Sequence, residues 1–167
     1  MIMKREVPIA EDETGESLHD KLAQAGAELC VETLKALEDD TAVFEKQGES
    51  PTAYAKMLTK ELGNIDWNNS AVQIERLVRG LNSWPSAYTH WNGKVMKIWK
   101  AKAESTQPDS DPAVSPGVVT EVGKDYFTVS TGDGILRVYE IQIPGKKRME
   151  TGAFLRGYAM EPGTVLG

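Results

Sequence analysis

The sequence predicts an α+β protein, in which a small antiparallel β-barrel follows two helices and a further strand and helix lie at the N-terminus. Five or six short strand patterns separated by turn residues occupy the last ~80 residues, which is typical of a small closed or nearly closed barrel. A capped amphipathic helix pattern precedes them. The first 38 residues hold one strand pattern and one long helix pattern, too little to build a core of their own.

The N-terminal segment predicts a strand over residues 1–9, an acidic loop and then a helix. Ser17 is the predicted N-cap of this helix, with Asp20 completing the cap three residues later. Residues spaced three and four apart form one mostly apolar stripe along the helix, and they are Leu18, Leu22, Ala25, Leu29, Thr33 and Leu37. Because such a stripe needs a cover, we expect residues 1–38 to be the end of a larger domain.

Residues 39–69 have the polar composition of a linker. One short helix is expected within it, over residues 52–62. Ser50 and Pro51 supply its cap and first turn, and Gly63 supplies its stop.

Residues 70–167 are predicted to form the C-terminal domain. Its first helix starts at Ser70, where Gln73 completes a capping box, and ends near Gly80. The Asn92-Gly93 pair then predicts a tight hairpin turn. Strands are expected at 87–91, 94–103, 117–122, 126–130 and 135–143, a short helix at 151–155 and a last edge strand at 163–166.

Composition and charge narrow the class of protein. The chain has 167 residues, 40% hydrophobic and 26% charged, an ordinary soluble mixture without an apolar run long enough to span a membrane and without a signal peptide. A single cysteine, Cys30, excludes an internal disulfide and a cysteine metal cluster. The net charge of −6 is uneven, since residues 1–40 carry −7 and residues 67–167 carry +2. An intracellular, cytoplasmic protein with separate acidic and basic parts is expected.

No pattern of catalytic residues stands out. His19 and His90 each lack a second ligand or partner at suitable spacing. The stretch 132–134, Gly-Asp-Gly, falls between two strand patterns and is interpreted as a hairpin turn rather than a phosphate cradle. We therefore predict no catalytic residue and no metal site in this chain.

Basic residues are the better candidates for function. They are either an ordinary soluble surface or a stripe that binds phosphates. The candidates are Lys60, Arg76, Arg79, Lys97, Lys100, Lys146, Lys147, Arg148 and Arg156. The four tryptophans all lie within residues 67–99, and we interpret them as core or seam residues in preference to a base-stacking platform.

Three stretches together resemble one protein family. They are YAK at 54–56 running to IDW at 65–67, IERLVRGLNSWPSAYTHWNG from Ile74, and GDGILRVYEIQIPGKKRM from Gly132 with FLRG from Phe154. They resemble the linker and C-terminal domain of methionyl-tRNA formyltransferases, which transfer a formyl group from 10-formyltetrahydrofolate to initiator methionyl-tRNA. The resemblance implies that residues 1–38 end a Rossmann-like α/β catalytic domain and that residues 70–167 are an OB-like tRNA-binding domain.

The resemblance carries over tRNA binding but no catalysis. The family's catalytic Asn, His and Asp match no position here, so the chain is expected to position initiator tRNA in translation initiation without performing the chemistry. Neither DNA nor a membrane is an expected partner. Two departures concern the turn at 82–86, where the family reads Asn-Pro-Trp-Pro-Gly, and Met57, where the family often has a lysine.

Two other functions stay open at this point. The first is the corresponding part of a sugar-nucleotide formyltransferase, whose barrel would be structural and have no tRNA role. The second is a protein–protein interaction module. The uncovered stripe of the 17–38 helix leaves three outcomes: packing on the barrel, self-association with another copy, or mobility.

Overall fold

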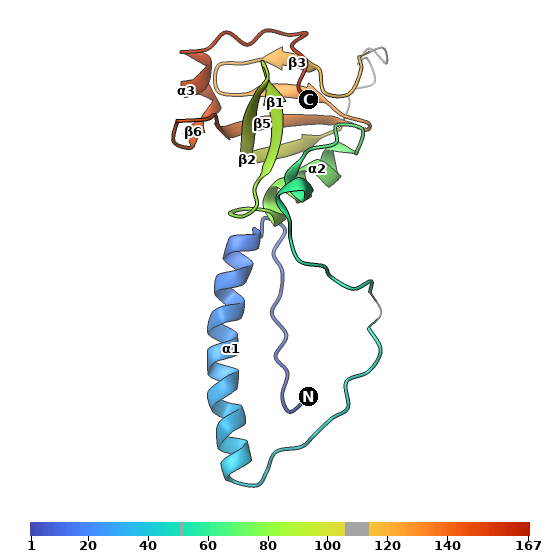
Figure 1. Ribbon diagram of the computed structural model, residues 1–167, viewed down its shortest axis with the longest axis vertical. Coiled ribbons are helices and arrows are strands. Elements are labelled where there is room, and N and C mark those ends of the chain that lie inside the picture. The colour runs from blue at the N-terminus through green and yellow to red at the C-terminus, as the bar shows by residue number, and fades with distance from the viewer. Residues whose placement is uncertain (51, 106–113) are drawn as a thin grey trace. The chain divides into compact units, whose positions relative to one another are not determined.

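The structure is a computed structural model that describes residues 1–50, 52–105 and 114–167. It divides into two compact units, Met1–Met57 and Leu58–Gly167 (Figure 1). The division falls inside the predicted linker, residues 39–69, and the predicted domain bounds stay a prediction.

The first unit contains one long helix, α1, over Gly15–Glu38. Its N-cap is Thr14, whose Oγ1 accepts from the Ser17 N–H at 3.1 Å, while the Ser17 Oγ accepts from the Thr14 N–H at 3.0 Å. The predicted cap at Ser17 is therefore wrong. Two capping residues three positions apart satisfy each other's backbone donors, and the helix consequently starts one turn earlier.

Residues 1–10 are extended, but they pair as a strand with none of the described residues, so the predicted strand over 1–9 is wrong. Side chains tie this segment to α1 instead: Arg5 donates to the carboxylates of Glu28 and Glu32 at 2.7 Å each. Every side chain of α1 is at least partly exposed, and Val31 and Leu34 are 68% and 61% exposed. Of the predicted apolar stripe, Leu22 and Leu37 are 50% and 40% exposed and the other four residues are half-buried, so the stripe is only partly covered among the described residues.

The helix predicted over residues 52–62 is also wrong. Residues 52–59 are irregular, and only Lys60–Gly63 forms a single 3₁₀ turn, η1. Tyr54 and Met57 are 89% and 92% exposed. With no apolar face buried, nothing offsets the cost of nucleating a short helix.

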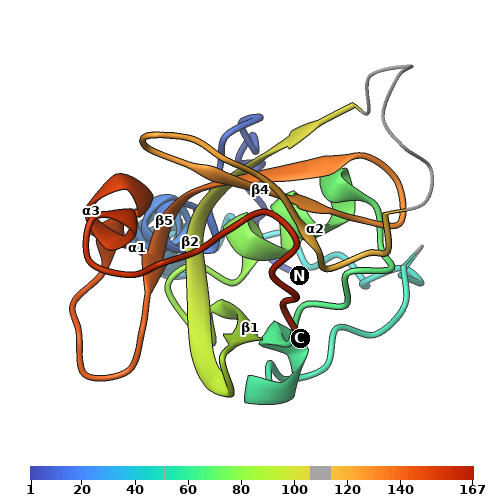
Figure 2. The same cartoon turned by 90° about the horizontal axis from the view of Figure 1, so that it is seen from above.

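The described residues of the second unit form a six-stranded antiparallel sheet in the order β1-β2-β5-β4-β3, with β6 pairing β5 (Figure 2). The hairpin and the three later strands are confirmed, whereas β6 had no sequence signal. The sheet is open rather than a closed barrel, and the OB-like topology is not confirmed. The strands are β1 (Ala87–Trp91), β2 (Lys94–Glu104), β3 (Val119–Val122), β4 (Phe127–Ser130), β5 (Ile135–Gln142) and β6 (Met149–Glu150).

Irregular segments lie along both edges of this sheet. At one edge, the Ile65 N–H donates to a β1 carbonyl at 2.8 Å. At the other edge, the Val119 N–H of β3 donates to the Thr164 carbonyl at 2.8 Å. The C-terminal segment continues to β1, where the Gly167 N–H donates to the His90 carbonyl at 3.1 Å (Figure 2). The edge strand predicted at 163–166 is thus present as one isolated bridge.

Two helices cover the sheet. Helix α2, Ala71–Gly80, starts at the predicted capping box of Ser70 and Gln73, and it packs on β2 and β5. Helix α3, Thr151–Leu155, was predicted and packs on β5 and β6. The core between these layers is apolar and contains Ile74, Val78, Met96, Ile98, Phe127, Leu136, Val138, Ile141 and Phe154.

The four tryptophans divide between core and surface. Trp67 is 5% exposed and donates its indole N–H to Thr89 Oγ1 at 3.1 Å, and Trp91 is 7% exposed, as expected for core residues. Trp84 is 56% exposed, so the interpretation as a core or seam residue is wrong for it, whereas Trp99 is half-buried and bonds Gln142 across β2 and β5, as a seam residue does.

The turn between β4 and β5 fixes the start of α2. The Gly132 N–H donates to the Trp67 carbonyl at 2.9 Å, and the Ala71 N–H donates to the Asp133 carbonyl at 2.8 Å. A Cβ atom at Gly132 would lie 1.9 Å from the Asn68 carbonyl oxygen. Residues 132–134 are therefore the predicted hairpin turn, and the turn seats the helix on the sheet.

Candidate nucleic-acid interface

The β1–β2 hairpin places Lys97 and Trp99 on the outer surface. The hairpin turns at Asn92 and Gly93, with φ of 50° and 70°, the left-handed conformation that a two-residue turn requires. Lys97 pairs with Gln142 of β5, and the register then shifts on either side of Lys100. This irregularity leaves Trp99 without a direct partner in β5 and half-buried at the surface.

Two cations lie over the Trp99 ring. The Lys97 Nζ is 5.6 Å from the ring centroid, and the Arg148 Cζ is 5.2 Å from it. The indole N–H donates to Gln142 Oε1 at 3.3 Å. Cation–π contacts of this kind contribute about 0.5–1 kcal/mol at exposed sites.

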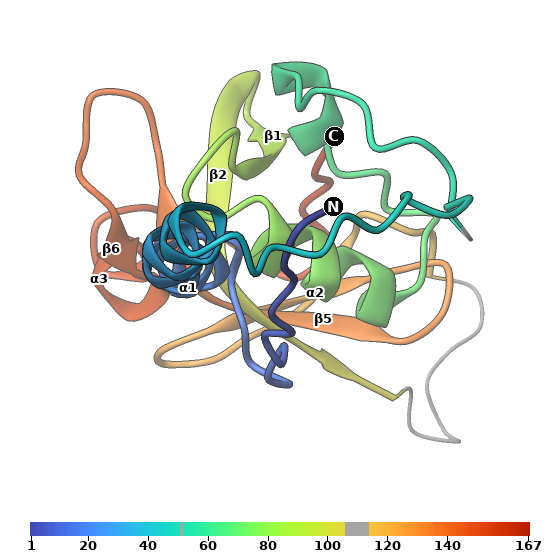
Figure 3. The same cartoon turned by 90° about the horizontal axis from the view of Figure 1, so that it is seen from below.

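The loop from Ile143 to Arg148 connects β5 to β6 and stands out from the sheet (Figure 3). Pro144 and Gly145 form a tight turn in which the Lys146 N–H donates to the Ile143 carbonyl at 3.1 Å. Gly145 has φ of +74°, which a glycine after proline adopts without strain. Lys146 and Lys147 are thereby presented to solvent.

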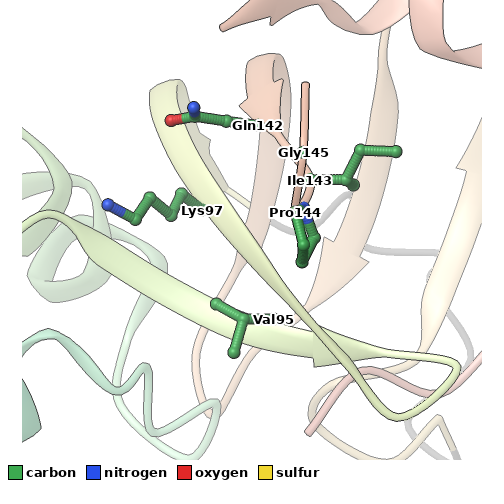
Figure 4. A pocket seen from close by; sticks show the side chains of 6 residues that line it. All are labelled: Val95, Lys97, Gln142, Ile143, Pro144 and Gly145. Atoms are coloured by element: carbon green, nitrogen blue, oxygen red, sulfur yellow. The ribbon is translucent and has the colours of Figure 1, made fainter. Parts of the chain in front are cut away.

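A small open pocket of about 120 Å³ lies between this loop and β2. Its lining joins apolar side chains to one ammonium and one amide (Figure 4). The lining residues are Val95, Lys97, Gln142, Ile143, Pro144 and Gly145. Ligand pockets are commonly about 300–1,000 Å³, so this hollow suits a surface contact better than an enclosed small molecule.

The structure brings four of the nine predicted site residues together. Lys97 and Arg148 meet at the Trp99 ring, and Lys146 and Lys147 lie on the same loop as Arg148. The other five lie away from the Trp99 ring and the loop: Lys60 on η1, Arg76 and Arg79 on α2, Lys100 further along β2 and Arg156 directly after α3.

The charges of these residues differ in availability. Arg148 forms an ion pair with Glu140, and Arg79 pairs with Glu75 at 3.5 Å. Within the described residues, Lys146 and Lys147 lie within 4.0 Å of no carboxylate. These two lysines are therefore the cations of the loop whose charge is open to an incoming anion.

A second cation–aromatic pair provides a contrast. Arg137 lies 3.9 Å from the Tyr126 ring centroid and donates to both oxygens of Glu104 at 2.7 and 2.8 Å. The hydrogen bonds to Glu104 hold the pKa of Arg137 above its ordinary value despite partial burial. This guanidinium is already paired with a carboxylate, and it joins β5 to Glu104 of β2 and to Tyr126, the residue before β4.

Sequence reasoning missed Gln142 and the surface role of Trp99. The signal for Gln142 was strand alternation, which places it on the same face of β5 as Glu140 and away from the buried Ile141. The signal for Trp99 was its position two residues after Lys97 on one strand.

No group of three or more His, Cys, Asp or Glu side chains in residues 1–50, 52–105 and 114–167 is arranged to hold a metal ion. In the same ranges, no helix combines the length and apolar character that crossing a membrane requires.

Comparison with known proteins gives a consistent result. Residues 57–159 match the family described as formyl transferase, C-terminal domain. The methionyl-tRNA formyltransferase of Agathobacter rectalis is 51% identical over 164 residues, covering 98% of this chain and 52% of that protein. The chain spans about half the length of the curated relatives it matches, and it aligns with their C-terminal half.

Solved structures share the fold at low identity. HypX from Aquifex aeolicus in complex with tetrahydrofolic acid has a TM-score of 0.52 at 20% identity, covering 78% of this chain and 22% of that one. The sugar 3N-formyl transferase WlaRD has a TM-score of 0.54 at 17% identity, covering 84% of this chain and 48% of that one. These likenesses concern the fold alone.

Proposed function

Because the chain belongs to the formyl transferase C-terminal domain family, we propose that it is the C-terminal half of a methionyl-tRNA formyltransferase and that it binds initiator methionyl-tRNA. The observation that carries the proposal is the 51% identity to a methionyl-tRNA formyltransferase over nearly the whole chain. The sugar-nucleotide alternative has only the distant structural likeness at 17% identity in its favour.

In this proposal the β5–β6 loop contacts the tRNA backbone. Lys146 and Lys147 bind phosphates as exposed point charges, since neither is paired with a carboxylate among the described residues. Contacts to phosphates fix register and orientation without reading sequence. Arg76 and Arg156 are exposed on α2 and after α3, and they are further candidates for phosphate contact.

The formyl transfer itself is assigned to the part of the enzyme that this chain does not cover. The reaction needs a base for the ammonium proton and a donor for the oxyanion. His19, one of the two histidines, has a 79% exposed side chain beside an equally exposed Asp20, which does not organise it as a base. We place the formyl donor in the part of the complete enzyme that carries out the transfer.

The domain organisation is part of the same proposal. Residues 1–38 end the catalytic domain, residues 39–69 link it, and residues 70–167 form the tRNA-binding domain with an OB-like topology. The site of action is the cytoplasm, where initiator tRNA is formylated. Self-association through the 17–38 helix stays a prediction, and the mass in size-exclusion chromatography with light scattering tests it.

A salt-dependent binding titration tests the tRNA contacts. Fluorescein-labelled, unacylated initiator tRNA is titrated with the purified chain at salt concentrations from about 50 to 300 mM. For the Lys146→Met, Lys147→Met double variant we expect weaker binding and a log–log salt slope about 1.4–1.8 smaller, because each cation on RNA or duplex contributes roughly 0.7–0.9. Lys124→Met, a change of an exposed lysine on the β3–β4 turn, serves as the control.

Two results would contradict the proposal. An unchanged affinity and slope in the double variant would remove the loop from the interface. Displacement of the labelled tRNA by a sugar nucleotide, at a concentration that leaves ionic strength constant, would favour the sugar-nucleotide alternative.

A further inference from the structure

A chain of hydrogen bonds runs from the end of α2 to the β5–β6 loop. Asn82 Nδ2 donates to the Trp99 carbonyl at 3.4 Å, and the Trp99 indole N–H donates to Gln142 Oε1 at 3.3 Å. Gln142 Nε2 then donates to the Lys146 carbonyl at 2.9 Å. Because both ends of the Gln142 amide are engaged, its side chain has one orientation in which it links the sheet to the loop.

The two-lysine segment is held at both of its ends. At Lys146, the backbone N–H is bonded to the Ile143 carbonyl and the backbone carbonyl is bonded to Gln142. At Arg148, the guanidinium pairs with Glu140 and lies over the Trp99 ring. The restraints on both ends of the segment therefore converge on Trp99 and Gln142.

Ordering of this kind affects affinity without any contact to a ligand. An exposed loop that contains Gly145 and long lysine side chains would otherwise lose conformational entropy when it binds a phosphate backbone. A loop whose backbone is already fixed loses less. The restraints also use the charge of Arg148 internally, since Glu140 neutralises it.

We propose that Trp99 and Gln142 are positioning residues that preorganise Lys146 and Lys147 for phosphate contact, and that Arg148 anchors the loop instead of binding phosphate. This inference rests on the proposed tRNA function and deepens it. It changes the role of Arg148 from the one that the charge pattern predicts.

A double-mutant cycle on tRNA binding tests the inference. Gln142→Met keeps the side-chain length and removes both hydrogen bonds, and Trp99→Phe keeps an aromatic face and removes the indole N–H. Each is measured alone and in the Lys146→Met, Lys147→Met background. Alone, each substitution is expected to weaken binding about three- to tenfold, the scale of one or two hydrogen bonds. In the Lys146→Met, Lys147→Met background, each is expected to weaken binding by less than about 1.5-fold.

Arg148→Lys provides a second, charge-conserving arm. It retains a positive charge but loses the paired contacts with Glu140 and the planar contact with Trp99. We expect it to weaken binding only when Lys146 and Lys147 are present. Tyr126→Phe removes an exposed side-chain hydrogen bond directly before β4 and is the matched control, with unchanged binding in both backgrounds.

The outcomes separate the two proposals. Equal losses in both backgrounds, or no loss for Gln142→Met and Trp99→Phe alone, would overturn the positioning role while the tRNA contacts stand. Unchanged binding in the Lys146→Met, Lys147→Met double variant would overturn the tRNA contacts, and the positioning role with them. Faster hydrogen exchange at the Lys146 amide in Gln142→Met, with an unchanged Tm, is expected and would show that the loss arises in the loop and not from unfolding.

Discussion

Replacing Gly132 with alanine should loosen the junction between the sheet and α2. The new Cβ would lie 1.9 Å from the Asn68 carbonyl oxygen and 2.7 Å from its carbonyl carbon. Cβ atoms essentially never approach within 3.0 Å of another heavy atom, so the turn or the 67–71 segment has to move by at least about 1.1 Å. Both partners are backbone, which leaves no flexible side chain to yield.

The size of the effect follows from the bonds at this turn. The Gly132 N–H donates to the carbonyls of Trp67 and Asn69 at 2.9 and 3.0 Å, and the neighbouring Ala71 N–H donates to Asp133 at 2.8 Å. Losing two such bonds costs about 1–3 kcal/mol. The alanine recovers up to about 0.4–1 kcal/mol by restricting the unfolded chain. A net loss of about 1.3 kcal/mol lowers Tm by roughly 4–8 °C in a unit of this size.

Differential scanning calorimetry measures this change. Gly80→Ala is the control, since Gly80 closes α2 and a Cβ there meets nothing within 4 Å. We expect Gly80→Ala to leave Tm unchanged or slightly raised, because alanine favours the helix. A Gly132→Ala chain that unfolds within about 2 °C of the unaltered one would refute the argument from close approach.

Three further predictions concern stability. The hydrogen bond from Lys21 lowers the pKa of Glu13 to about 2, below its unfolded value, so this contact stabilises α1 above about pH 5 and is lost as the pH falls toward 2. Helical circular dichroism should fall over that window, and Glu13→Gln should remove the dependence. Trp67→Phe leaves the Thr89 hydroxyl unpaired and should cost about 1–2 kcal/mol in urea unfolding, with m unchanged. Phe154→Ala, at a fully buried position, should cost about 3–5 kcal/mol.

The sequence predicted the elements whose signals are local. Two such elements formed as expected, the capping box of Ser70 and Gln73 and the hairpin turn at 92–93. Each depends only on residues a few positions apart in the sequence. The strand predicted over residues 1–9 failed because a strand exists only through its partner, and no local pattern reports whether a partner is present. The two-residue strand β6 was missed for the same reason, since pairing with β5 defines it.

The candidate site was predictable in its charge but not in its organisation. The run from Lys146 to Arg148 is visible as a cluster of cations after a Pro-Gly turn. Arg148 is the cation of this run that is neutralised, because it pairs with Glu140 of β5. The sequence alone does not show that these two side chains are close in space. The lack of a direct β5 partner for Trp99 follows from a register shift in β2, and such irregularities arise from the pairing of whole strands.

The irregular segments along the sheet have a consequence for solubility. An uncovered sheet edge offers a row of unpaired backbone groups to which another chain can add a strand. Here the Ile65 N–H donates a hydrogen bond to a carbonyl of β1. Residues 163–167 form backbone hydrogen bonds with β3 and with β1. Removing these last five residues would uncover the edge of β3 and also take away Leu166, a buried core residue, so a few residues of coil both complete the core and cover an edge to which another chain could add.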